Sequence, residues 1–373
     1  MKSVGIICEY NPFHNGHLYH INKVKELYPD HKIILVMSGY FTQRGEISIL
    51  TKWEKTKIAI EAGVDIVIEL PLIYATESAD TFALGAVKIL NELKVEYLVF
   101  GSECDDIEKL STIASLELEN DLSIKHYLDL GYNYPTALSL SIKEKLNIEV
   151  SSPNDLLGIC YIKAIKKLKS NIIPISILRT SDYFNSNLDN NIISANDIRK
   201  LLKEKKSVAN YIPNFVSIAN YYDQNDLFKY FKYKVLTDSK LDEYLGVDEG
   251  IGNLITKHIS DSESFDELIS KIKTKRYTYN RLSRIYIHIL LSITKKESEF
   301  HKKNLYIRLL GFNKDGQKYL NSIKKDLNYP LIVKYCQKWT DVLELDLRTT
   351  KLYSLLNNKV LKEEYQNSPI KKV

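Results

Sequence analysis

Near its start the chain reads Cys8-Glu9-Tyr10-Asn11-Pro12-Phe13-His14-Asn15-Gly16-His17. The apolar run Val4-Gly5-Ile6-Ile7 before it predicts a buried strand, and Asn11-Pro12 predicts where that strand is broken. From Gly16 onward, apolar residues recur at the spacing of an amphipathic helix. Two histidines spaced H-x-G-H are therefore expected where a first strand gives way to a first helix.

A junction of this kind suits a phosphate group. Free backbone N–H groups and the positive end of the helix dipole face the ligand, and Gly16 leaves room for a nucleotide against the backbone. The imidazoles of His14 and His17 can donate to phosphoryl oxygens as negative charge develops during a displacement at phosphorus. The motif therefore predicts a nucleotide site with both histidines in catalytic roles.

Two other interpretations of the histidines stay open. His14, His17 and His20 form H-x-x-H-x-x-H, a spacing that metal ligands can have, although no cysteine or carboxylate pattern completes such a site. The same histidines could also be ordinary polar residues at a turn. We favour the nucleotide phosphate and expect no metal held by the protein itself.

The front half of the chain predicts an α/β fold. Strands are expected over residues 4–7, 32–37, 65–70, 97–101 and 172–178, with helices over 51–62 and 77–93. Strands with few polar alternations, separated by helices, indicate a parallel, Rossmann-like sheet covered on both faces. Ligands of such sheets bind at the carboxyl ends of the strands, where the candidate site residues fall.

The remaining segments have helical patterns. A helical insertion is expected at about 105–170, between the fourth and fifth strands, and the pattern after Ile193 is helical for the rest of the chain. A frayed tail is expected from about Lys362. We place a boundary near 205–225, which divides the chain into a catalytic domain (1–210) and a mainly α-helical domain (211–373).

Charge is distributed unevenly between the two halves. Residues 1–200 carry a net charge of −5, and residues 201–373 carry +10. A mildly acidic front and a basic back suggest a catalytic domain joined to a domain that binds a polyanion. The alternative is that abundant lysines simply decorate solvated faces.

Composition indicates a cytoplasmic protein. No signal peptide is expected, because Met1-Lys2 leads straight into the first strand, and the apolar runs are too short to span a bilayer. The four cysteines are scattered without a C-x-x-C, which fits a reducing compartment and no zinc ribbon.

Further motifs follow the other predicted strands. The loop 38–46 contains Arg44, which either faces phosphate or is an exposed loop arginine. Gly101 ends the fourth strand and permits close approach of an adenine or ribose. Ser194 can cap a helix from which Arg199 projects. As a lone match, this last element would be an ordinary capped helix.

A dense basic segment lies in the back half. It runs from Lys271 to Arg284 with six basic residues and no acidic one, interleaved with tyrosines. Such a segment suits phosphate contacts and stacking on unpaired bases. The alternative is a solvated helix face. The residues predicted to bind nucleic acid are Lys271, Lys273, Lys275, Arg276, Tyr277, Arg281 and Arg284.

Taken together, the motifs resemble a known family. In order, the chain contains E-Y-N-P-F-H-N-G-H, S-G-x-F-x-Q-R-G-E, I-E-L-P, F-G-S-E, S-P-N-D-x-L-G and I-S-x-x-x-I-R over residues 1–200. This set looks like the bacterial tRNA(Met) cytidine acetate ligase family, whose catalytic sheet is an H-x-G-H nucleotidyltransferase (HUP-type) fold. The resemblance implies an ATP-dependent ligase that activates acetate as acetyl-adenylate, releases pyrophosphate and acetylates N4 of the wobble cytidine of elongator tRNA(Met).

The resemblance also implies site residues and partners. Catalytic roles fall on His14, His17, Arg44 and Arg199. ATP contacts fall on Ile7, Glu9, Tyr10, Asn11, Pro12, Phe13, His14, Asn15, Gly16, His17, His20, Gly101, Asn154, Arg179 and Ser194. Mg²⁺ is expected to arrive with ATP, and the partners are elongator tRNA(Met), bound by the basic domain, and acetate. No membrane and no obligate protein partner are expected.

Independent of the resemblance, Asn154 in a tight turn and Arg179 after the fifth strand could both reach a nucleotide at the sheet edge, although Arg179 could also be a surface arginine. Two other functions stay open. A small-molecule adenylyltransferase would not need the large basic appendage. An RNA-binding protein on an inactive nucleotide fold would not need the intact H-x-G-H.

Overall fold

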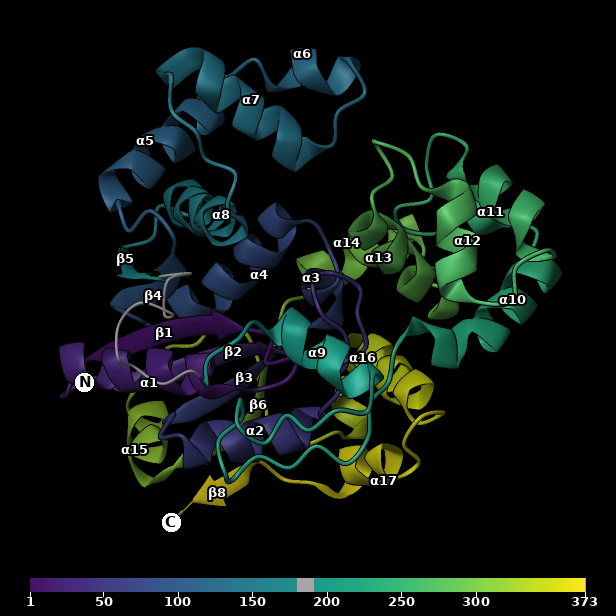
Figure 1. Cartoon of the computed structure of the whole chain (residues 1–373). Helices are drawn as coiled ribbons and strands as arrows, with labels where there is room; N and C mark the ends of the chain where they lie inside the picture. The colour runs from purple at the N-terminus through teal and green to yellow at the C-terminus, as the bar shows by residue number, and fades with distance from the viewer. Residues whose placement is uncertain (180–190, 373) are drawn as a thin grey trace.

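The computed structural model describes residues 1–179 and 191–372, which form one sheet surrounded by helices (Figure 1). The sheet has the order β5-β4-β1-β2-β3-β6-β7, and β8 pairs with β6. Its strands are β1 (Ser3–Cys8), β2 (Lys32–Ser38), β3 (Ile66–Leu70), β4 (Tyr97–Ser102), β5 (Ile173–Leu178), β6 (Ile307–Asn313), β7 (Leu331–Ile332) and β8 (Ile370–Lys372).

The first five strands are parallel, and the inner strands are buried on two faces, whereas β5 at the edge is partly exposed. Along β2, Ile33, Leu35 and Met37 pack in one apolar cluster, whereas Ile34 and Val36 pack in another. The first cluster includes side chains of α1 (Asn15–Leu27) and α2 (Lys52–Glu61), and the second includes those of α4 (Ala79–Glu92) and α8 (Pro153–Lys167). The predicted α/β fold class, a parallel sheet with helices on both faces, is confirmed.

The helical insertion between β4 and β5 is also as predicted. It consists of α5 (Ile107–Leu118), α6 (Ile124–Asp129), α7 (Tyr134–Leu146) and α8. In Figure 1 α5, α6 and α7 stand above the sheet, while α10 to α13 lie to one side of it.

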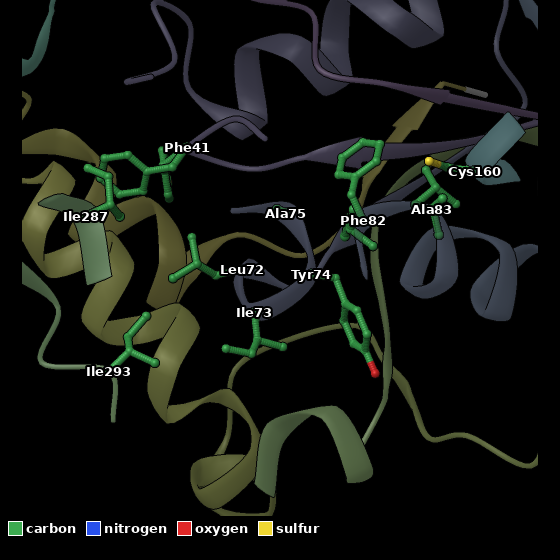
Figure 2. Packing of buried hydrophobic residues seen from close by; sticks show 14 of the residues in the cluster. Phe41, Leu72, Ile73, Tyr74, Ala75, Phe82, Ala83, Cys160, Ile287 and Ile293 are labelled. Carbon is green, nitrogen blue, oxygen red and sulfur yellow. The ribbon is translucent and has the colours of Figure 1, made fainter. Parts of the chain in front are cut away.

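The back half is mainly helical. Its helices are α9 (Ala195–Lys203), η1 (Gln224–Leu227), α10 (Phe228–Thr237), η2 (Leu241–Glu243), α11 (Ile251–Ile259), α12 (Phe265–Ile272), α13 (Tyr279–Leu290), α14 (Lys295–Lys303), α15 (Lys314–Ile323), η3 (Gln337–Trp339), α16 (Thr340–Tyr353) and α17 (Lys359–Gln366). The short α3 (Leu72–Ala75) joins this half to the sheet, because Leu72 and Ile73 lie between Ile287 of α13 and Phe82 of α4 (Figure 2).

The prediction of an entirely helical chain after Ile193 is wrong, because β6 returns to the sheet and pairs antiparallel with β3. Gly311 allows this approach, since a Cβ there would lie only 2.6 Å from Thr56 of α2. The frayed tail predicted from Lys362 is wrong as well, because α17 packs on the protein and β8 extends the sheet. The division into domains at residue 210 stays a prediction, and the sheet contains strands from both sides of it.

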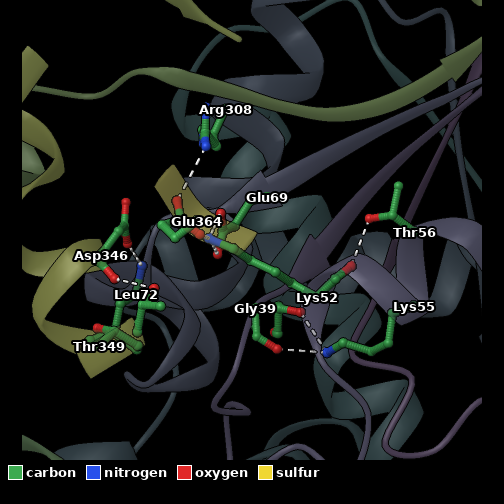
Figure 3. A network of polar contacts seen from close by, with 12 residues as sticks. Gly39, Lys52, Lys55, Thr56, Glu69, Leu72, Arg308, Asp346, Thr349 and Glu364 are labelled. Atoms are coloured by element: carbon green, nitrogen blue, oxygen red, sulfur yellow. Dashed lines mark hydrogen bonds and ion pairs between the residues drawn. The ribbon is translucent and has the colours of Figure 1, made fainter. Parts of the chain in front are cut away.

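A buried charge network holds the carboxyl-terminal helices to the sheet (Figure 3). The ammonium of Lys52 on α2 lies 2.9 Å from Glu69 of β3 and 2.7 Å from Glu364 of α17, and Arg308 of β6 lies 3.2 Å from Glu364. All four residues are buried. Nearby, burial and the Glu69 charge raise the pKa of Asp346 well above its usual range.

Candidate nucleotide site

The H-x-G-H motif lies at the start of α1, as predicted. His14 caps the helix, and its Nδ1 accepts a hydrogen bond from the Gly16 N–H at 3.0 Å. The Nδ1 of His17 accepts in turn from the His14 backbone N–H at 3.3 Å, and the two ring centroids lie 3.8 Å apart. A Cβ on Gly16 would lie 2.9 Å from the His14 ring, so the glycine lets this ring fold back over the helix start.

These contacts define the charge and tautomer of both histidines. Because each Nδ1 accepts a hydrogen bond, the ring proton resides on Nε2, which is left as a donor. Burial lowers the pKa of His14 to about 3, and the charges of Arg179 and Arg199 act in the same direction. Burial also holds the pKa of His17 well below its usual range. At neutral pH the pair therefore presents two neutral N–H donors.

Aromatic rings and a buried amide support the motif. Tyr10 packs against His17 with centroids 4.7 Å apart, and Phe13 packs against Tyr10 at 4.8 Å. The Asn11 side chain donates to the Ile47 carbonyl and accepts from the Ile49 N–H, which ties the H-x-G-H loop to the loop after β2. Of the remaining members of the predicted stretch, Pro12 is buried and Ile7 packs partly against the core.

Two other predicted ATP contacts on α1 have different surroundings. The Asn15 amide donates to the carbonyls of Asn191, before α9, and Asn210, after it, both at 3.0 Å. On His20, the buried Nε2 has no hydrogen-bond partner among the residues that the structure describes. Burial lowers the pKa of His20 to about 4, with Arg179 contributing, so this ring too is neutral.

At the ends of β4 and β5, three predicted residues come together. Gly101 makes room for Arg179, because a Cβ there would lie 2.7 Å from the arginine Cδ. The exposed Arg179 guanidinium donates to the Asn154 side-chain oxygen at 3.4 Å, and the Asn154 amide donates to Glu103. The close approach predicted at Gly101 is thus made by a protein side chain.

The loop that carries Arg44 is held from both sides. On the β1 side, the Glu9 carboxylate accepts from the Gln43 N–H at 2.5 Å, and burial raises the pKa of Glu9. On the helical side, Ser283 of α13 donates to the Gly45 carbonyl at 2.8 Å, and Arg284 donates to the Gln43 carbonyl at 3.2 Å. Arg44 itself is half-buried and forms no hydrogen bond or ion pair within residues 1–179 and 191–372.

The last predicted motif caps α9 as expected. Ser194 accepts from the Asp197 N–H at 3.2 Å. Arg199 then points back to the site, where Nη1 donates to the Asn11 carbonyl at 2.7 Å and Nη2 lies 3.0 Å from Glu46. The predicted residues of the front half thus converge, but Arg199 already uses two of its nitrogens to join two loops.

Comparison with known proteins agrees with this geometry. A family model described as HIGH Nucleotidyl Transferase matches residues 1–368. The tRNA(Met) cytidine acetate ligase of Caldicellulosiruptor bescii is 41% identical over 99% of this chain and 98% of that protein. The enzyme of the same name from Clostridium novyi is 38% identical over 99% of both chains. This chain belongs to the tRNA(Met) cytidine acetate ligase family.

Solved structures of the family have the same fold. The crystal structure of Thermotoga maritima TmcAL bound with alpha-thio ATP matches with a TM-score of 0.89 and 28% identity, covering 100% of this chain and 99% of that one. The apo form of the same protein matches with a TM-score of 0.90. The family resemblance predicted from the motifs is confirmed.

In this family member, only some side chains of the basic segment are exposed and without a protein partner among the described residues. Lys273, Lys275 and Arg276 are exposed between α12 and α13, although Arg276 lies 2.5 Å from Glu249. Lys275 also lies 5.9 Å from the Tyr132 ring of the insertion. Arg281 stacks at 4.0 Å over Tyr277, which is itself buried.

Three of the residues predicted to contact nucleic acid have protein partners in this structure. The buried Tyr277 ring is closed to a base, and its hydroxyl donates to the Asp248 carbonyl. Arg284 points to the Arg44 loop, and Lys271 is paired with Glu267 at 2.8 Å. The basic segment runs from the end of α12 through a turn into the middle of α13, so some of its side chains face the protein and others face solvent.

Metal ligands do not gather at the histidine motif in the part of the chain that the structure describes. Among the described residues, the possible metal ligands that do lie close together are Glu297, His301 and Glu344, on α14 and α16. The single guanidinium of Arg348 forms ion pairs with both carboxylates. None of the helices in the described ranges combines the length and apolar character required to span a bilayer.

Several functional contacts come from residues that no motif predicts. Gln224 donates to the Gly45 carbonyl at 3.0 Å, and Ser283 donates to the same carbonyl. Lys55 donates to the carbonyl of Glu9, next to the H-x-G-H loop. For Lys55 a weak signal exists, since Lys52 and Lys55 fall on the same face of α2 as the apolar Ala59. For Gln224 and Ser283 no local pattern points to the loop they hold.

Proposed function

We propose that this protein activates acetate with ATP and transfers the acetyl group to N4 of the wobble cytidine of elongator tRNA(Met), in the cytoplasm. In the first step, an acetate oxygen attacks the α-phosphorus, the bond to the β-phosphate oxygen breaks, and pyrophosphate leaves. In the second step, the cytidine N4 attacks the acetyl carbonyl, AMP leaves, and N4 loses a proton. The products are N4-acetylcytidine, AMP and pyrophosphate.

The observation that carries the proposal is the neutral histidine pair. Two Nε2–H donors at the amino terminus of α1 supply fixed dipoles where charge grows on the α-phosphate, and they need no reorganisation during the reaction. Arg44 and Arg179 are our candidates for binding the phosphates, because Arg44 lies in the loop after β2, Arg179 follows β5 directly, and neither forms an ion pair with a described carboxylate. Arg199 is better suited to positioning the two loops.

Mg²⁺ would enter with the triphosphate rather than reside in the protein. The carboxylates around the site already have partners, since Glu9 accepts from Gln43, Glu46 pairs with Arg199, and Glu103 accepts from Asn154. This fits a cation held mainly by phosphate oxygens and water, as is usual for Mg²⁺ with nucleotides. Bound in that way, it would neutralise charge on the leaving pyrophosphate.

For the tRNA, we propose the exposed residues Lys273, Lys275 and Arg276 as backbone contacts. They lie at the turn before α13, the helix whose Ser283 and Arg284 hold the Arg44 loop. The turn also faces the insertion through Lys275 and Tyr132, so an RNA bound there would lie close to the nucleotide site.

The test is incubation with ATP, labelled acetate and total tRNA. Acetate-dependent exchange of pyrophosphate into ATP, together with label in tRNA, is the expected result. Exchange that depends on another acid or on a phosphate acceptor would instead indicate a small-molecule adenylyltransferase. RNA binding with no turnover of ATP would indicate an inactive nucleotide fold.

A further inference from the structure

Lys55 of α2 is fully buried beneath the nucleotide site. Its ammonium donates to three backbone carbonyls, those of Ser38 and Gly39 at 2.7 Å and that of Glu9 at 3.0 Å; the bond to Gly39 is visible in Figure 3. An ammonium has three N–H bonds, so each carbonyl receives one. Since β1 ends at Cys8 and β2 ends at Ser38, Lys55 joins the carboxyl ends of two neighbouring strands.

Both functional loops start from these carbonyls. The chain leaves β1 at Glu9 and reaches His14 five residues later, and it leaves β2 at Gly39 and reaches Arg44 five residues later. A group that fixes both starting points therefore fixes the separation of the histidine donors from Arg44. Catalysis by fixed dipoles depends on such separations, because the donors must meet the α-phosphate without further movement.

Carboxylates neutralise the charge of Lys52, but none forms an ion pair with Lys55 in the part of the chain that the structure describes. Lys52, one turn earlier and equally buried, lies between two carboxylates, whereas Lys55 forms no ion pair with any carboxylate that the structure describes. The titratable groups that face Lys55 are Cys8, Glu9 and Glu69. Of these, Cys8 is neutral, because burial raises its pKa far above neutrality.

A buried, unpaired ammonium costs free energy that an apolar residue would not. Accordingly, burial lowers the pKa of Lys55 to about 8. Such a residue is favoured where its charge and its donors serve a function. Here the positive charge lies at the strand ends where an anionic nucleotide would bind.

We propose that Lys55 is a positioning residue for acetyl-adenylate formation, which holds the H-x-G-H loop and the Arg44 loop together through its charged form. The inference rests on the proposed function. If it holds, the wild-type rate of acetate-dependent pyrophosphate exchange should fall as pH rises through about 8, because the neutral amine has one donor fewer and no charge.

A loss of rate through unfolding can be distinguished from this effect. The Lys55 pKa is lower in the folded chain than in the unfolded chain, so the unfolded chain binds more protons between about pH 8 and the ordinary lysine pKa, about 10.4. Titration of Lys55 alone therefore makes the fold no less stable as pH rises. We expect the exchange rate to fall at least threefold between pH 7.5 and 9.5 while the melting temperature does not fall.

The variants Lys55→Met and Lys55→Arg test the assignment. The methionine variant should lose turnover tenfold or more, and its residual rate should show no fall near pH 8. The arginine variant keeps a charge that does not titrate in this range, so its rate should likewise stay level to pH 9.5. Lys25→Met is the control, because Lys25 also donates to a carbonyl, that of Ala62 at 2.6 Å, but lies on α1 away from the strand ends.

Three results would overturn the inference: a wild-type rate that stays level to pH 9.5, a fall near pH 8 that persists in a folded variant, or wild-type turnover in Lys55→Met. If neither variant folds, the Lys55 side-chain nitrogen can be titrated by NMR in the wild-type protein, where its midpoint must coincide with that of the rate. The proposed function fails separately, by absence of acetate-dependent exchange at pH 7.

Discussion

Arg199 donates a hydrogen bond of 2.7 Å to the main-chain oxygen of Asn11, a residue 188 positions earlier in the chain. Its second nitrogen pairs with Glu46, so one guanidinium joins the H-x-G-H loop to the Arg44 loop, as the Lys55 ammonium also does. We expect Arg199→Ala to reduce pyrophosphate exchange by roughly tenfold to a hundredfold, as for a misplaced catalytic group. Lys200→Ala, which removes an exposed charge next to it, is the control and should exchange normally.

The histidine pair should act on turnover. Alanine at His14 or His17 removes a donor that we propose stabilises charge on the α-phosphate, so kcat should fall by roughly a hundredfold or more. Equilibrium binding of ATP, measured in the absence of acetate, should change far less. Weaker ATP binding with wild-type turnover at saturation would be incompatible with the assigned role.

The pH dependence of the same step follows from the lowered pKa of His14, about 3. The folded pKa lies below the unfolded value of about 6.5, so the unfolded chain binds the extra proton first and this ring makes the fold less stable as pH falls from 6.5 towards 3. Between pH 6 and 7.5 the ring is neutral throughout. We therefore expect the rate of pyrophosphate exchange not to fall as pH is lowered through 6.5. If the wild-type rate did fall with a midpoint near pH 6.5, and His14→Ala lacked that fall, His14 would not act as a neutral donor.

Gly45 offers a test of the contact between α13 and the Arg44 loop. Its φ is +74°, and a Cβ would lie 2.5 Å from the backbone nitrogen of Arg284, so Gly45→Ala must displace the loop. Turnover should fall tenfold or more. Gly250→Ala is the matched control, because its φ of +79° brings similar backbone strain but its Cβ would meet nothing within 4 Å. Equal activities of the two variants would show that the contact is dispensable.

The exposed basic turn should affect tRNA alone. Replacing Lys273, Lys275 and Arg276 with alanine should raise the tRNA KM roughly tenfold and reduce the salt slope of binding by roughly two to three units, because fewer counterions are released. Pyrophosphate exchange should be unchanged. The control removes three exposed lysines, Lys318 of α15 and Lys324 and Lys325 directly after it; Figure 1 shows α15 on the other side of the molecule from α12 and α13. An unaltered tRNA affinity and salt slope would assign the tRNA site elsewhere.

The buried network should determine stability. Glu364→Ala leaves the charges of Lys52 and Arg308 without this partner inside the protein, so we expect it to lower the free energy of unfolding by about 3–5 kcal/mol. Lys362→Ala, on the exposed side of the same helix, should change it by less than about 0.5 kcal/mol. Denaturant titration measures both, and equal stabilities would contradict the network.

Local patterns explain how much of this protein can be predicted from sequence. The runs at 4–7 and 32–37 reveal parallel strands because both faces are buried, and H-x-G-H is recognisable because its donors lie within four residues. The run at 307–313 is also largely apolar, but it contains Arg308 and its partner β3 lies about 240 residues earlier, so nothing local distinguishes it from a buried helix. Lys55, Gln224 and Ser283 act on loops far from them in sequence, and only the fold brings them together.

The activity proposed for this protein is the acetylation of a tRNA cytidine with ATP as the energy source. Purified protein should be incubated with ATP, acetate and unmodified elongator tRNA(Met), and the digested tRNA analysed by mass spectrometry for N4-acetylcytidine. We predict one acetylated cytidine per tRNA, dependent on both ATP and acetate, and none when the wobble position carries uridine. Exchange of pyrophosphate without acetylated cytidine in this tRNA would contradict the account.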